Sequence, residues 1–129
     1  MTKQEISTRF KYHLQGSQKL KKIVIDTVQM LSDKQMQFVT KNCWFVGSMD
    51  EAWAFTLQAG DLEKGHYLIF LSDELLDEDD DQIEYTILHE VGHVILGHRN
   101  AILERQSKSQ IKKQERQADG FAEEILTKK

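Results

Sequence analysis

Apolar residues recur every three to four positions in the N-terminal part of the chain, the spacing that places side chains on one face of an α-helix. The first series predicts an amphipathic helix that ends near Gly16, and the second predicts a helix over about residues 20–31. The two series consist of Ile6, Phe10, His13 and Leu14, and of Leu20, Ile23, Val24, Thr27, Val28 and Leu31. Ser32 followed by Gln35 has the form of a capping box and predicts a third, short helix through about Lys41.

The pattern then changes to three short runs of aromatic and aliphatic residues. The runs are "CWFVG" at 43–47, "AWAFTLQ" at 52–58 and "HYLIFLS" at 66–72, with turn-like segments between them. Such runs are typical of β-strands, so we expect a three-stranded antiparallel sheet in which consecutive strands are neighbours. The acidic segment "DELLDEDDDQ" that follows is interpreted as a solvated loop with a helical turn.

Helical periodicity returns after this acidic segment. Asp81 and Glu84 form a second capping-box pattern, which predicts a helix that begins near Gln82. Gly97 and Asn100 mark its predicted end. The apolar positions of this helix are Ile83, Ile87, Leu88, Val91, Val94 and Ile95.

A last helix is expected over about residues 108–126, with Ile111, Ala118, Ala122 and Ile125 on one face. Helices, then a small sheet, then two further helices indicate an α+β fold rather than the alternation of a parallel sheet. The chain has 129 residues, which suits one domain over residues 1–129.

Composition narrows the function classes. A net charge of −4 with dispersed basic residues argues against direct binding of nucleic acid, because phosphate contacts need clustered Lys and Arg. Cys43 is the one cysteine, so a reducing compartment is the simpler expectation. The N-terminal segment does not resemble a signal peptide and no stretch is apolar enough to span a bilayer, so we expect a cytoplasmic protein without membrane contact.

The segment "HEVGHVILGH", residues 89–98, carries the strongest chemical signal. His89 and His93 are four positions apart, so a helix projects both from one face, where two imidazoles can bind one zinc ion. Glu90 lies about 100° round the helix from His89. It can flank the metal and act as general base on a zinc-activated water. The alternative is a core helix whose histidines are hydrogen-bonded structural residues.

A second cluster, "ERQADGFAEEIL" at residues 115–126, supplies candidates for a third ligand. Glu115 and Asp119 are four positions apart, and a carboxylate on an apolar helix face is costly without a partner or a metal. We therefore expect Glu115 to complete a His-His-Glu site, which leaves one position open for water. Asp119 is expected to accept a hydrogen bond from the outer nitrogen of a ligand histidine. In the alternative reading, Glu115 pairs with a basic neighbour such as Lys112.

Other residues enter as less favoured candidates. His98 lies about 140° round a regular helix from His93, so it points away unless the helix has already ended. Cys43 at a predicted strand start is expected to be buried rather than to cap the zinc. The group that stabilises the oxyanion of the attacked carbonyl stays open among Tyr67, Tyr85, His66 and His98.

These motifs resemble the gluzincin class of zinc metallopeptidases, and more narrowly the ImmA/IrrE family, in which a HExGH helix is followed by E-x-x-A-D/N-x-F-A. The resemblance covers about residues 66–126, and the small size is similar to that of minigluzincins. It implies a zincin-like fold, zinc ligands at His89, His93 and Glu115, a catalytic Glu90 and a supporting Asp119. It also implies a protein or peptide substrate, including repressor-type proteins.

The sequence therefore predicts a zinc-dependent peptidase. A substrate peptide is expected to add to an exposed edge of the sheet beside the metal. The alternative is a non-catalytic, zinc-containing regulatory or protein-binding module of a mobile-element or stress-response system. Another possibility is a structural zinc with a fourth protein ligand, such as His98 or Cys43.

Overall fold

The computed structural model describes residues 1–48, 54–58, 66–98 and 107–128. Trp53 and Asn100, which belong to the predicted second strand and to the predicted end of the active-site helix, lie outside these ranges. The elements are α1 (Lys3–Phe10), a 3₁₀ turn (Lys11–His13), β1 (Leu14–Gln15), α2 (Gln18–Val28), α3 (Asp33–Asn42), β2 (Cys43–Ser48), β3 (Ala54–Gln58), β4 (Tyr67–Ser72), α4 (Asp73–Leu76), α5 (Asp80–Ile95) and α6 (Lys108–Thr127). The predicted α+β class is confirmed.

Helix starts follow local chemistry closely. A Ser, Thr or Asp side chain caps each α-helix by accepting a hydrogen bond from a backbone N–H of the first turn. The capping box of Ser32 and Gln35 is present at the start of α3 as predicted. The predicted box of Asp81 and Glu84 is wrong. Asp79 caps α5 by accepting from the Gln82 backbone N–H at 2.9 Å, and Glu84 is buried instead.

The first helix is shorter than predicted. α1 ends at Phe10, and Lys11 has a positive φ of 54°. Leu14 and Gln15 then form β1, which pairs in parallel with β2. The apolar spacing continued through His13 and Leu14, but Leu14 is buried as a strand residue and not as part of a helix face.

The predicted three-stranded antiparallel sheet is wrong. Within the described residues, the sheet has four strands in the order β1-β2-β4-β3. β2 pairs with β4 in parallel, and only β3 is antiparallel, along β4. The continuous apolar run of β4 is typical of a strand flanked on both sides, and Ile69 and Leu71 are fully buried. β3 is therefore displaced to the edge of the sheet.

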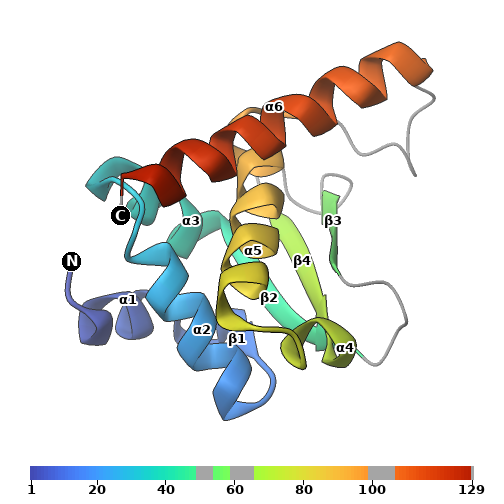
Figure 1. Ribbon diagram of the computed structural model, residues 1–129. Helices are drawn as coiled ribbons and strands as arrows, with labels where there is room; N and C mark the ends of the chain where they lie inside the picture. Colours follow the sequence, from blue (N-terminus) through green and yellow to red (C-terminus); the bar gives the residue numbers. More distant parts are fainter. Residues whose placement is uncertain (49–53, 59–65, 99–106, 129) are drawn as a thin grey trace.

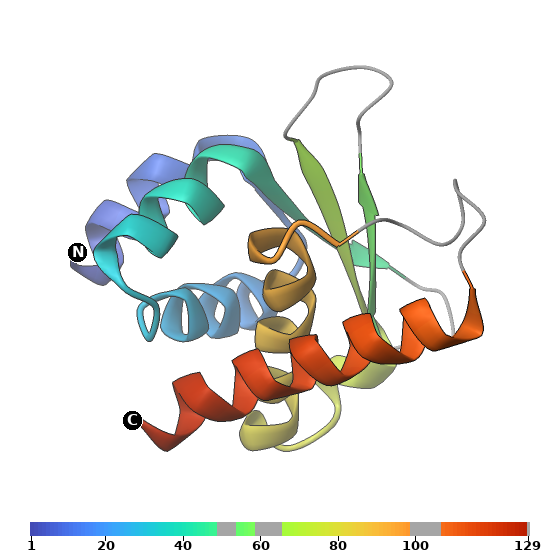
Figure 2. The same cartoon turned by 90° about the horizontal axis from the view of Figure 1, so that it is seen from above.

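α5 occupies the middle of the molecule. It packs against α2, β3 and α6, and α6 runs across it (Figure 1). Seen from above, α5 lies between the N-terminal helices and the strands (Figure 2). Its buried apolar residues join one core cluster with those of α1, α2, α3, β2 and β4. Among the described residues, no helix is long and apolar enough to cross a membrane.

Candidate metal centre

One flank of α5 holds both histidines at the margin of the core. Ile87, Leu88 and Val91 are fully buried, whereas the side chains of His89 and His93 retain 15% and 17% of their exposure. The apolar residues thus anchor the helix while the two rings reach the surface one turn apart.

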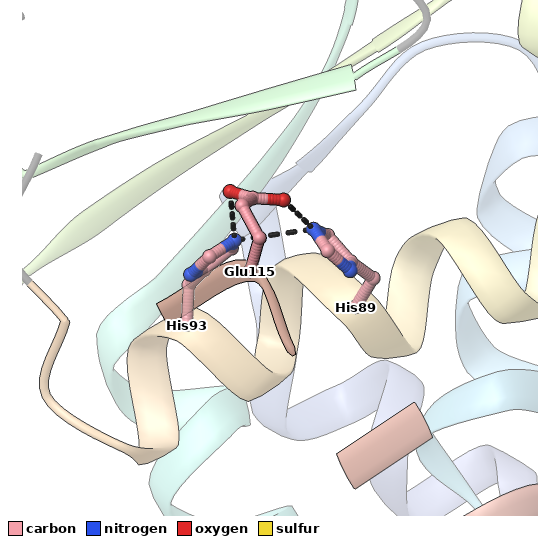
Figure 3. Close-up of side chains that lie close together, drawn as sticks. All are labelled: His89, His93 and Glu115. Atoms are coloured by element: carbon pink, nitrogen blue, oxygen red, sulfur yellow. Dashed lines mark hydrogen bonds and ion pairs between the residues drawn. The ribbon is translucent and has the colours of Figure 1, made fainter. Parts of the chain in front are cut away.

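α6 brings Glu115 to the two rings. The Glu115 carboxylate oxygens lie 3.0 Å from His89 Nε2 and 3.1 Å from His93 Nε2, and the two Nε2 atoms are 3.1 Å apart. Figure 3 shows the three side chains converging, two from α5 and one from α6. In the part of the chain that the structure describes, these residues form the group with three potential ligand atoms within 4.8 Å of one another.

Close contact between the two helices makes this convergence possible. A Cβ added at Gly92 would lie 3.1 Å from the Phe121 ring, so only a residue without a side chain fits there comfortably. Ala118 and Ala122 are the fully buried residues of α6. Small residues on both helices therefore let α6 approach α5 closely enough for a glutamate to reach the histidines.

The outer nitrogen of His89 is held from α6 as well. His89 Nδ1 lies 2.8 Å from Asp119 Oδ1, and the Tyr85 hydroxyl donates to the same oxygen at 2.8 Å. A carboxylate can only accept here, so Asp119 favours a proton on His89 Nδ1 and leaves Nε2 as the nitrogen that could bind a metal. Burial, and then the Asp119 carboxylate, raise the pKa of Tyr85 to about 12, so its hydroxyl stays a donor.

His93 favours the neutral form that metal binding requires. Burial lowers its pKa to about 4, despite the opposing attraction of the Glu115 carboxylate. A neutral imidazole offers one lone pair, which is the form of histidine that binds metals.

The donor set fits zinc. Two imidazole nitrogens and one carboxylate are ligands of catalytic zinc sites. Bonds of 2.0–2.1 Å in a tetrahedral site place ligand atoms about 3.3 Å apart. The spacings of 3.0 to 3.1 Å between the three atoms here are a few tenths of an ångström shorter, so a slight opening would admit the ion.

Glu90 follows His89 on α5, and its side chain is buried, with 8% of the residue exposed. Glu115 contacts both histidines. Cys43 is fully buried, as expected, and burial raises the pKa of its thiol to about 12.

His98 does not join the three-residue group. α5 ends at Ile95, and His98 folds back to contact the outer nitrogen of His93 and not its Nε2 atom. Sequence reasoning missed this contact, and it also missed the Tyr85 hydroxyl on Asp119. The only local signal for the second is that Tyr85 precedes His89 by one helical turn.

Comparison with known proteins agrees with the class of protein that this geometry suggests. Residues 81–129 match the model of the family described as Peptidase U49, which is well under half of the chain. The match indicates a peptidase family and supports a peptidase function in general. It includes all the residues of the candidate metal centre. No curated protein and no solved structure matched the chain.

Proposed function

We propose that the protein is a zinc-dependent peptidase in which His89, His93 and Glu115 bind the metal. The observation that carries the proposal is the convergence of two histidine nitrogens and one carboxylate from two helices, at 3.0 to 3.1 Å. The peptidase family match over residues 81–129 supports the hydrolysis of peptide bonds. From the resemblance of its motifs, we propose more narrowly a gluzincin of the ImmA/IrrE type. Repressor-type proteins are the substrates that this resemblance implies.

The chain's own residues would divide the chemistry between them. Zinc in this position would supply Lewis acidity to a water molecule and to the scissile carbonyl. Glu90 would take a proton from the attacking water and later return one to the leaving amine. Asp119 and Tyr85 would act as positioning residues, because Asp119 contacts His89 Nδ1 and would hold a proton there, which would leave Nε2 for the metal.

The edge of the sheet offers a place for the substrate. β3 is at one end of the strand order and packs against α5. In Figure 3, strands of the sheet pass the face of α5 that carries the histidines. An extended peptide added along the outer edge of β3 would gain main-chain hydrogen bonds and lie beside the metal centre.

Metal content and affinity test the site directly. We expect about one zinc ion per chain by elemental mass spectrometry of protein purified without chelators. Glu115→Ala should weaken zinc binding by more than the roughly 10–100-fold that loss of an outer partner costs. Glu124→Ala is the matched control, because this glutamate lies on the same helix and pairs with Lys128 at the surface. Equal zinc affinity in the Glu115→Ala and Glu124→Ala variants would contradict the proposed ligand set.

Glu90→Gln separates the peptidase from a non-catalytic zinc module. This variant should keep its zinc and lose the hydrolysis of unstructured protein substrates such as casein, since an amide cannot take the proton of the attacking water. Hydrolysis that persists in zinc-loaded Glu90→Gln protein would overturn the assignment of the general base.

A further inference from the structure

The N-terminal half of α6 is basic, although the chain as a whole has a net charge of −4. Between positions 108 and 116 the single carboxylate is that of Glu115. The basic residues of this half are Lys108, Lys112, Lys113 and Arg116. All four are exposed, and in the part of the chain that the structure describes none of them forms an ion pair.

The stability of α6 gives no reason for these charges. The N-terminus of a helix carries a partial positive charge that favours acidic side chains, but the first turn of α6 has none and begins with Lys108. Lys108, Lys112 and Arg116 also follow one another at intervals of four residues, where like charges repel. Both features disfavour the helix, so we looked for a partner outside it.

The basic half of α6 is not covered by the helix that supports the rest of it. Among the described elements, α6 packs most extensively on α5, and its buried residues are Ala118 and Ala122. Residues 108–117 are exposed apart from Ile111 and Gln114, which are half-buried. Both views show this half projecting past α5 on the side where β3 and β4 lie (Figures 1 and 2). A substrate peptide added to β3 would bind on that same side.

Helix geometry places two of the lysines on the face that carries Glu115. Lys112 and Lys108 precede Glu115 by three and seven positions, so they project from the same face, about 4.5 and 10.5 Å away along the axis. An extended peptide spans the longer distance in about three residues. Lys113 lies about 160° round the helix from Glu115, on the opposite face.

We propose that Lys108 and Lys112 select acidic substrates by contacting Asp or Glu side chains within about three residues of the scissile bond. This inference rests on the proposed peptidase function and on the metal centre beside the two lysines. Glu115 and Asp119 share their helix face, but both carboxylates contact His89, so the lysines remain available to a ligand from outside. The attraction acts between solvated charges and should therefore weaken with salt.

Cleavage of a peptide mixture tests the selection. We expect the bonds that zinc-loaded wild-type protein cleaves in a digested proteome, identified by mass spectrometry, to be enriched in Asp and Glu within about three residues. For one such acidic peptide, kcat/KM should fall about two- to fivefold in Lys112→Gln. It should fall further in Lys108→Gln/Lys112→Gln. In about 1 M salt, where the Debye length is about 3 Å, these differences should disappear.

Lys113→Gln is the matched control, because it removes the same charge from the neighbouring residue on the opposite helix face. It should retain the wild-type kcat/KM and the wild-type preference for acidic residues. All these lysines are exposed, so circular dichroism and zinc content should be unchanged in every variant. Equal losses in Lys112→Gln and Lys113→Gln, or wild-type cleavage sites without enrichment in Asp and Glu, would overturn the selection and leave the peptidase standing.

Binding to zinc-loaded Glu90→Gln protein separates recognition from hydrolysis. The probe is a fluorescein-labelled peptide of alternating Glu and Ser residues, compared by anisotropy with its counterpart of Gln and Ser. The acidic peptide should bind more tightly, and this difference should shrink when Lys108→Gln/Lys112→Gln is added but not when Lys113→Gln is added.

The binding experiment also has outcomes that divide the two proposals. Acidic binding that depends on the two lysines, in a protein whose wild type cleaves no peptide, would overturn the peptidase and leave acidic recognition standing. Equal binding of the two peptides would overturn acidic recognition. A short RNA that displaces the probe at lower concentration than the unlabelled acidic peptide would do the same, and would identify the basic half of α6 as a nucleic-acid surface.

Discussion

Gly92 and Phe121 show how single residues set the geometry of the candidate metal centre. The Phe121 ring lies against Gly92, in the space that a larger side chain would need. A Cβ added at Gly92 would lie 3.1 Å from this ring. Glu115 belongs to the helix that this contact positions, and its oxygens reach two nitrogens of α5. A glycine between the two histidines of the motif thus contributes to the site without bearing any ligand atom.

Cys43 provides a prediction at the scale of one residue. Its thiol is fully buried and burial raises its pKa to about 12, so almost none of the reactive thiolate exists at neutral pH. We expect no reaction of folded protein with an aromatic disulfide reagent at pH 8 and one reacted thiol per chain in concentrated urea. Rapid reaction under native conditions would contradict the buried position and reopen a role for this cysteine at the metal.

α5 shows how an element combines its own signals with those of its neighbours. Its start is set by Asp79 and its end by the left-handed Gly97. Between them, one side is buried in the core and one flank carries His89 and His93. The helix must therefore begin and end at defined positions for the rings to stay in register with Glu115.

The cap of α5 can be tested with two neighbouring aspartates. Asp79→Ala should lower the free energy of unfolding by about 1 kcal/mol, because the Asp79 side chain accepts from the Gln82 backbone at 2.9 Å. Asp81→Ala should cost clearly less, since it removes the same charge near the helix start without removing the capping bond. Urea denaturation measures both values, and equal losses would return the cap to the position that the sequence pattern favoured.

At the scale of the whole molecule, the candidate metal centre links the two C-terminal helices. His89 and His93 come from α5 and Glu115 comes from α6. An ion bound there would connect α6 to the helix that lies at the centre of the core.

Zinc should therefore stabilise the fold as a whole. A ligand that binds only the folded state adds about 2.7 kcal/mol to the free energy of unfolding at 100 times its dissociation constant. We expect a gain of this order in urea denaturation of wild-type and Glu124→Ala protein, reversed by a chelator. Glu115→Ala should gain much less, and a full gain in that variant would place the zinc elsewhere.

The features that could be predicted from the sequence are those that depend on local interactions. The helices over 18–28, 33–42 and 108–127 follow from apolar spacing and cap residues, both of which act within a few positions of the chain. The contact between His89 and His93 and the burial of Cys43 are likewise consequences of short spacing and local hydrophobicity.

The sequence alone determined which helices form and which side chains of α5 and α6 share a face, because helix geometry is the same wherever the helix is placed. The tertiary structure decided the strand order, in which β4 takes the centre and β3 the edge, because strand pairing joins residues far apart in the chain. It also decided the approach of Glu115 to the histidines and the return of His98 to His93. These contacts depend on how closely two packed helices meet and on where one of them ends.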